Sequence, residues 1–345
     1  MSSARGIIRR MNRKLRGSFT PPPEHFARLP AISGNAVNGV GETQPRRPTP
    51  VFWHKPEIEA HGALQEAIVA HFNSEPGLRK IYWNLAARGP KQLPPVADRV
   101  EERAPAEWAA ALKAHALVCD AELVGIARLD PLWVYDGYPV PELPWVVIVG
   151  RAMAHARIDQ APATPENLEG AAVVADEYNH TTRAARLLAA WVRARGFQAE
   201  PHGGPWAGPI NLLPAAVACG FGELGKHGSL INRTFGSSFR IASLLTDMPL
   251  VADAPDVFGA DAFCTRCKVC VDSCPPDAIA EEKRLVRGVT KWSVDFDRCI
   301  PYFDATYGCG ICVAVCPWSA PGRAPVLAER WARRTAIKQT ADRRA

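Results

Sequence analysis

The sequence contains no long apolar run. Its most apolar stretches, at 143–150 (LPWVVIVG) and 212–222 (LLPAAVACGFG), have the length of a strand or a short helix. A helix that crosses a bilayer needs about 20 predominantly apolar residues, so we do not expect this protein to associate with a membrane. The net charge of +6 is small and comes largely from the two ends of the chain. It therefore indicates no basic surface for DNA in the folded middle.

The first 22 residues contain a twin arginine, Arg9-Arg10, but no apolar segment follows it. An export signal requires such a segment, so we expect a cytoplasmic protein. Because basic tails are usually solvated, we interpret residues 1–50 as an irregular arm. An alternative is that its start lies on an anionic surface, since four apolar residues share a helical face: Ile7, Ile8, Met11 and Leu15.

Cysteine is scarce in the first 263 residues, which contain only Cys119 and Cys219. Both lie in apolar segments, where a free cysteine behaves as a small buried hydrophobe, and we expect them to be inert. The other eight cysteines fall between positions 264 and 316. This distribution separates a long upstream region from a short cysteine-rich module.

The eight late cysteines form two runs, each closed by a Cys-Pro pair. The first reads Cys264-x2-Cys267-x2-Cys270-x3-Cys274-Pro275, and the second reads Cys299, then Cys309-x2-Cys312-x3-Cys316-Pro317. In such paired runs three thiolates wrap one iron–sulfur cube and the fourth ligates the other cube. We therefore predict two [4Fe-4S] clusters with crossed ligation. Cluster 1 is bound by Cys264, Cys267, Cys270 and Cys316, and cluster 2 by Cys274, Cys299, Cys309 and Cys312.

Zinc or disulfides are the alternatives for these cysteines. Structural zinc sites favour two CxxC pairs and close on four ligands each, which two runs ending in Cys-Pro do not match. Disulfide frameworks are typical of short secreted chains. The spacing therefore favours the two clusters.

The pattern along the chain predicts a mixed α/β domain over 51–258, a ferredoxin-like module over 259–323 and a basic helical tail over 324–345. Within the first domain, apolar periodicity predicts helices at 105–120 and 181–196 and strands at 121–129, 144–150 and 197–200. The overall fold class is α+β.

A glycine-rich segment lies just before the module, with eight glycines between His202 and Arg240. The stretch 220–228 (GFGELGKHG) has few side chains, so its backbone could approach a large flat ligand. The phosphate-loop pattern GxxxxGK[ST] is absent, and we interpret the segment as a cofactor site of another kind. Turns alone are the plainer alternative.

Four segments together resemble the corrinoid-dependent reductive dehalogenases. They are EYNHTTRAARLLAAWVRARGFQAEP, GELGKHGSLINRTFG, LTDMPLVADAPDVFGADAFCTRCKVC and WSVDFDRCIPYF with GCGICVAVCPWS. The resemblance runs in consistent order from about residue 100 to 320. Epoxyqueuosine reductases are similar in the glycine loop and the crossed runs, but they usually carry an aspartate-centred motif where this chain has EYN.

The resemblance implies a base-off cobalamin or related corrinoid between a nitroreductase-like core and the cluster module. The absence of a D-x-H-x-x-G stretch, which would supply a lower histidine ligand, agrees with this. The resemblance also implies that Tyr178 donates a proton and that Lys226 lowers its pKa, since a cation stabilises a phenolate. The corrinoid contacts expected from the glycine-rich segment are Gly203, Gly204, His227, Gly228 and Phe235.

The function implied is reductive removal of halide from a small organic substrate, with electrons from an external ferredoxin- or flavodoxin-type donor. Two alternatives stay open at this stage, namely an epoxyqueuosine reductase and a non-catalytic two-cluster electron carrier. Five aromatic residues are candidates for lining a substrate pocket: Trp53, Tyr82, Trp133, Tyr135 and Tyr138.

Overall fold

The computed structural model describes residues 23, 27–54, 61–205 and 208–342. The segment with Arg9-Arg10 and the four apolar residues near it lie outside this part of the chain. Among the described residues, no helix combines the length and the apolar character needed to cross a bilayer.

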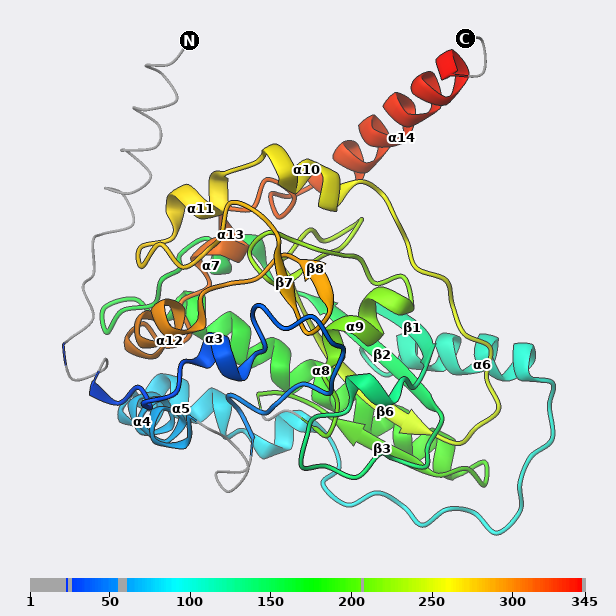
Figure 1. The fold of residues 1–345 in the computed structure, drawn as a ribbon. Helices are drawn as coiled ribbons and strands as arrows, with labels where there is room; N and C mark the ends of the chain where they lie inside the picture. The colour runs from blue at the N-terminus through cyan, green and yellow to red at the C-terminus, as the bar shows by residue number, and fades with distance from the viewer. Residues whose placement is uncertain (1–22, 24–26, 55–60, 206–207, 343–345) are drawn as a thin grey trace.

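A four-stranded antiparallel sheet forms the centre of the upstream region (Figure 1). Its order is β1-β2-β6-β3, with bounds Leu123–Arg128, Trp145–Ala152, Phe239–Thr246 and Ala199–His202. The run of valine and isoleucine in β2 is buried on both sides, because alternate residues point to opposite faces. Val147 and Val149 pack into one hydrophobic cluster, and Val146 and Ile148 pack into another.

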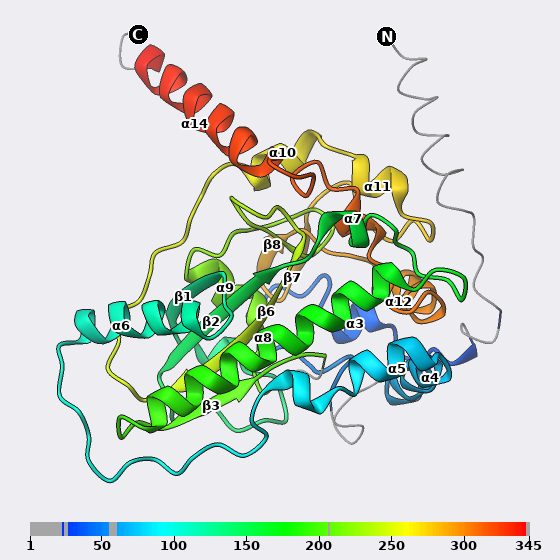
Figure 2. The ribbon, with the colours of Figure 1, turned by 180° about the vertical axis from the view of Figure 1, so that it is seen from behind.

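Helices cover both faces of this sheet. Trp108 and Leu112 of α6 (Pro105–Val118) pack with Leu188 of α8 (Glu169–Arg193) on one face, and Figure 2 shows α8 running along it. The short helix α9 (Leu212–Ala218) covers the other face.

The predicted helices and strands of this region are found, with differences of extent. The strand expected at 197–200 lies at Ala199–His202. The helix expected from 181 already begins at Glu169, so Tyr178 lies inside it. Within it Ala185 and Ala189 are fully buried, whereas Leu187 and Trp191 are half-buried. Small residues on its buried face let the helix approach the sheet closely.

Further short elements precede and connect these layers: α3 (Gly34–Val37), α4 (Gly62–Ser74), α5 (Pro76–Tyr82), η2 (Leu85–Arg88), η3 (Pro131–Trp133), α7 (His155–Ile158), and the hairpin β4 (Glu223–Leu224) with β5 (Leu230–Ile231). The cysteine-rich module contains α10 (Ala260–Arg266), α11 (Val269–Ser273), β7 (Arg284–Val286), β8 (Val289–Lys291), α12 (Phe296–Ala305) and α13 (Ile311–Ala314). Helix α14 (Arg323–Asp342) follows and projects away from the body in both views (Figures 1 and 2).

The described part of the predicted arm packs on the module. The N–H of Gly41 donates to the Leu285 carbonyl at 2.8 Å, and Val40 forms a β-bridge with Val286. The N–H of Gly34 donates to the Asp297 carboxylate at 2.7 Å. These contacts make the arm an extra strand-like layer over the β7–β8 hairpin.

The upstream region and the module meet closely at Gly236. Its φ of 61° lies in the left-handed region, and a Cβ placed there would stand 2.1 Å from the Trp318 carbonyl oxygen. Because backbone atoms cannot move aside as a flexible side chain can, any side chain at 236 would force the two parts apart.

We expect Gly236→Ala to lower the melting temperature of the cluster-loaded protein. A left-handed backbone costs a non-glycine residue about 1–2 kcal/mol, and the backbone clash adds to this. Gly322→Ala is the matched control, because Gly322 has a φ of 71° with nothing within 4 Å of its Cβ position. Thermal unfolding should show Gly236→Ala melting lower than Gly322→Ala by roughly 4 °C or more. Equal melting temperatures would contradict the close approach.

Candidate active site

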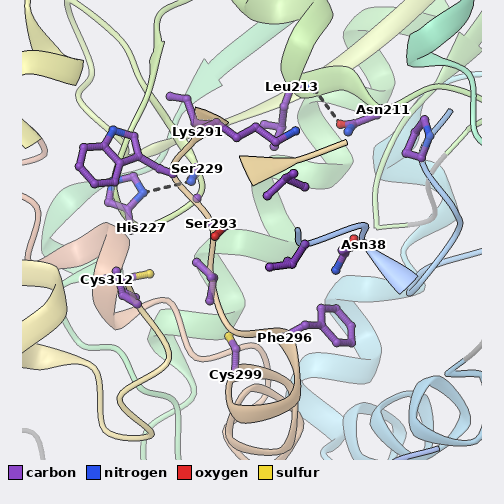
Figure 3. Close-up of a pocket in the computed structure, with 18 of the residues that line it drawn as sticks. Asn38, Asn211, Leu213, His227, Ser229, Lys291, Ser293, Phe296, Cys299 and Cys312 are labelled. Atoms are coloured by element: carbon purple, nitrogen blue, oxygen red, sulfur yellow. Dashed lines mark hydrogen bonds between the residues drawn. The ribbon is translucent and has the colours of Figure 1, made fainter. Parts of the chain in front are cut away.

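A cavity of about 860 Å³ lies between the sheet, the arm and the cysteine-rich module. Its walls come from distant parts of the chain, as Figure 3 shows for Asn38 of the arm, Asn211 before α9, and Cys299 and Cys312 of the module. This size is typical of small-molecule and cofactor sites, which occupy about 300–1,000 Å³.

The structure brings together the four thiols predicted for cluster 1: Cys264, Cys267, Cys270 and Cys316. Burial, with the neighbouring charges of Cys316 and Cys267, raises the pKa of the Cys264 thiol to about 12. The pKa of Cys270 is also raised, by burial first and then by the other three thiols. Such mutual influence requires thiols that surround one space.

The four thiols predicted for cluster 2 form a second group, and all of them line the cavity: Cys274, Cys299, Cys309 and Cys312. Burial raises the pKa of Cys312, and the largest neighbouring charges on it are those of Cys309 and Cys299. No three His, Cys, Asp or Glu side chains in the described ranges are placed to hold a single metal ion. The mutual influence of the four thiols on their pKa values places them in one group.

The structure does not bring Lys226 to Tyr178. The backbone N–H of Lys226 faces the Cys264 sulfur at 3.5 Å, and its Nζ lies 4.9 Å from the centre of the Trp292 ring. The side chain is 1% exposed. The hairpin that carries Lys226 turns it toward the first thiol group, and none of its described contacts is with Tyr178. The expected action of Lys226 on Tyr178 stays a prediction with no contact to support it.

The cation beside Tyr178 is Arg240, which the sequence reasoning missed. Its guanidinium carbon lies 5.5 Å from the centre of the Tyr178 ring, and Arg240 also lines the cavity. It is the second residue of β6, which crosses the sheet beside α8. No local motif marks it, since only the packing of β6 and α8 brings the two residues together.

The five expected corrinoid contacts divide into two sets. His227 and Gly228 line the cavity. Gly203 and Gly204 instead lie against α8, where a Cβ on Gly204 would stand 2.2 Å from the Tyr178 ring. Phe235 packs into the hydrophobic core under the sheet. The expectation that Gly203, Gly204 and Phe235 face the cavity is therefore not met, because these residues serve packing.

Both ring nitrogens of His227 are occupied. Nδ1 accepts from the Ser229 N–H at 3.1 Å, and Nε2 donates to the Ser237 hydroxyl at 2.9 Å, which in turn donates to the Leu230 carbonyl. Burial lowers the pKa of His227 to about 4, so the ring is neutral at neutral pH. It has no free nitrogen to offer a metal.

The glycine-rich turn also contains the spacing GxGxxG, at Gly220, Gly222 and Gly225. A dinucleotide fingerprint requires a preceding strand and a following helix. Here α9 precedes the segment, and the β4–β5 hairpin contains and follows it. The spacing therefore does not indicate a dinucleotide site.

The five aromatic candidates for a substrate pocket lie in three different places. Trp133 lines the large cavity, whereas Trp53 and Tyr82 face a small neighbouring cavity with Pro205. Tyr135 and Tyr138 lie beside the ring of His54: their ring centres are 4.3 and 6.0 Å from it. Cys119 and Cys219 are buried as expected, and burial raises the pKa of both thiols.

Comparisons with known proteins agree with this architecture. Residues 263–320 match the family described as a 4Fe-4S dicluster domain. The chain is 29% identical over 261 residues to the tetrachloroethene reductive dehalogenase of Sulfurospirillum multivorans, covering 62% of this chain and 51% of that protein. It is 36% identical over 125 residues to the epoxyqueuosine reductase of Leadbetterella byssophila, covering 31% of this chain and 37% of that protein.

A solved reductive dehalogenase, reported to suggest a mechanism for B12-dependent dehalogenation, matches 96% of this chain and 51% of its own with a TM-score of 0.70 at 21% identity. This chain therefore has the fold of a reductive dehalogenase, and the predicted resemblance is confirmed. It spans about half the length of the dehalogenases that it matches. Its relatives of both kinds are oxidoreductases.

We expect crossed effects from two single substitutions in the cysteine runs. Cys316→Ser should alter the cluster that Cys264, Cys267 and Cys270 bind, because its thiol lies in their group. Cys274→Ser should alter the other cluster. Iron content and electron paramagnetic resonance of the reduced protein will measure both. If each substitution affected only the cluster of its own run, the crossed arrangement would be wrong.

Proposed function

We propose that this chain is a cobamide- and iron–sulfur-dependent reductase that removes halide from a small organic substrate. The overall reaction takes two electrons and one proton: R–X + 2e⁻ + H⁺ gives R–H + X⁻. The electrons come singly from an external low-potential donor of the ferredoxin or flavodoxin type. The proposal includes a nitroreductase-like core over 51–258 and a two-cluster module over 259–323.

One observation supports this proposal most directly. A single cavity is lined by the second thiol group, by His227 and Gly228 of the glycine-rich turn, and by Arg240, which stands beside Tyr178. An electron source and a cofactor site would thus meet at one cavity, and Arg240 would connect its wall to the proposed proton source, Tyr178.

The residues around the cavity fit a corrinoid. Besides its size, the cavity wall carries two buried polar atoms without a hydrogen-bond partner, Ser293 Oγ and Arg240 Nε, and Figure 3 shows Ser293 near the centre of the wall. Buried polar groups normally have partners, so both atoms are suited to polar groups at a corrin edge. A bound corrinoid supplies a strongly reducing cobalt centre for carbon–halogen cleavage.

His227 is the histidine at the cavity wall, and its two nitrogens are already bonded to Ser229 and Ser237. Ligation of cobalt by His227 would break a buried pair, which costs about 1–3 kcal/mol. The geometry therefore favours a corrinoid bound without a histidine ligand.

Tyr178 is the proton donor in this proposal, and Arg240 is the cation that stabilises its phenolate. Loss of the proton leaves a negative charge on the phenol oxygen, and a guanidinium a few ångströms away favours that charge. Arg240 thereby takes the role that the sequence had assigned to Lys226. The proton leaves Tyr178 as negative charge develops on the substrate carbon.

We expect the Co(II) form of the cobalamin-loaded protein to be base-off. Its electron paramagnetic resonance spectrum should show no nitrogen superhyperfine splitting, because His227 keeps both nitrogens in the protein network. His227→Gln should give the same cobalt signal, which makes it the matched control. Nitrogen splitting that disappears in His227→Gln would show that the histidine binds cobalt.

We expect Tyr178→Phe to lower kcat by about 10²–10⁴-fold, the usual contribution of a positioned acid. Arg240→Met should lower kcat as well, and the double variant should be little worse than either single variant, because the two groups act as a unit. Activity can be assayed with reduced methyl viologen on brominated and chlorinated phenols and alkenes. Tyr307→Phe is the control, since its hydroxyl donates to Glu75, away from Arg240. Full activity of Tyr178→Phe on an accepted substrate would exclude this role.

A second candidate function is epoxyqueuosine reduction, which the 36% identity over 125 residues supports. The assay is the epoxyqueuosine content of tRNA from a deletion strain. A non-catalytic electron carrier is the remaining alternative, and cobalt content after expression with cobalamin distinguishes it, because only the reductases need the corrinoid.

A further inference from the structure

Lys226 is a buried cation that belongs to neither the cavity nor the proton donor. Its side chain is 1% exposed, and it forms no ion pair with any described carboxylate within 4 Å. Burying an unpaired ammonium is costly, so a negatively charged group that the chain itself does not supply would offset that cost.

The position of Lys226 identifies that group. Its backbone N–H faces the Cys264 sulfur at 3.5 Å. Burial raises the pKa of Cys267 and of Cys270, and the Lys226 charge acts against this by lowering both. The ammonium is therefore close enough to the first thiol group to act on whatever charge that group carries.

Trp292 separates this charge from the cavity. The indole is 5% exposed, lines the cavity, and packs with Cys264 and Cys316. Lys226 lies 4.9 Å from the ring centre. The charge of Lys226 therefore acts on the first thiol group, and the Trp292 ring lies between Lys226 and the cavity.

The charge of Lys283, the other lysine at the Trp292 ring, is paired with a carboxylate. The Nζ of Lys283 lies 5.4 Å from the Trp292 ring centre, but it pairs with the Asp261 carboxylate at 2.7 Å. The Lys283 side chain is about one third exposed, so solvent screens it further. Both lysines lie at the Trp292 ring, but the charge of Lys283 is paired and screened, whereas the charge of Lys226 can act on the first thiol group.

The second thiol group has no such neighbour among the charges that act most on it. Burial raises the pKa of Cys299 and of Cys274, and the nearby acidic groups Asp295 and Asp277 raise them further. Carboxylates thus lie near both thiol groups, Asp261 and Asp272 at the first and Asp295 and Asp277 at the second. Among the described charges that act most on them, the buried cation Lys226 acts on the first group.

We propose that Lys226 raises the reduction potential of cluster 1 above that of cluster 2, so that cluster 1 holds an electron while cluster 2 is oxidised. A cube bound by four thiolates is negatively charged, and its one-electron reduction by an external low-potential donor adds a further negative charge. A fixed cation stabilises the reduced form more than the oxidised form. Lys226 acts through the cluster and is a positioning residue.

This asymmetry suits the layout of the two groups. Cluster 2 borders the cavity, and cluster 1 lies beyond it, with Cys267 half-exposed at the surface. An electron that enters at cluster 1 is stored there until it passes to cluster 2, and cluster 1 can then accept the second electron. The inference depends on the two clusters and not on which substrate the cavity takes.

The test is a redox titration of the full chain with both clusters, followed by electron paramagnetic resonance, without substrate and both with and without cobalamin. Cys274→Ser identifies the signal of cluster 2. In the unaltered protein the cluster 1 signal should appear at the higher potential. The opposite order would overturn the proposal without any variant, and it would leave the proposed function untouched.

Lys226→Met keeps the length of the side chain and removes its charge, so the cluster 1 potential should fall while that of cluster 2 moves much less. Lys226→Arg keeps the charge and should restore most of the shift. Lys283→Met is the control and should leave the order unchanged. If Lys226→Met fails to bind iron, Lys226→Gln serves as the neutral variant. An unchanged cluster 1 potential in a fully loaded neutral variant would overturn the proposal.

Discussion

A buried hydrogen-bonded chain at His227 joins the two halves of this protein. The ring accepts from Ser229 and donates to Ser237, whose hydroxyl reaches the Leu230 carbonyl and whose N–H donates to Ser319 of the module. Such groups are costly to leave unpaired, so the glycine-rich hairpin has one favourable position. That position sets one wall of the cavity and, through Lys226, one side of the first thiol group.

The structure shows two different cations where the sequence pointed to Lys226 alone. Arg240 lies at the cavity wall beside Tyr178, whereas Lys226 is buried between the Trp292 ring and the first thiol group. In our proposals Arg240 acts on Tyr178 and Lys226 acts on cluster 1. The two proposed roles fall to different residues because charge interactions weaken with distance and screening.

The amino-terminal arm contributes more than a covering layer. Asn38, Val40 and Arg46 line the cavity, and Arg46 is held there by Glu42 at 2.7 Å and by the Val37 carbonyl at 3.0 Å. The β-bridge between Val40 and Val286 fixes the arm to the hairpin that carries Val289 and Lys291 to the same wall. The arm and the module thus form this wall together.

The sequence alone determined the features that depend on short spacing. The spacing within each cysteine run indicated which three of its thiols meet, because short loops decide it, and the apolar periods located the helices and the buried strand β2. The fourth thiol of each group comes from the other run, so its place depends on how the two runs pack. The tertiary structure decided what depends on packing between distant segments. It showed that Arg240 lies beside Tyr178, that Lys226 turns away, and that Gly204 supports α8. A motif such as LGKHG shows that a lysine is present, but the direction of its side chain follows from how the hairpin packs on the module. The orientation of the lysine side chain is set by that contact, and the residues next to it in the sequence do not indicate it.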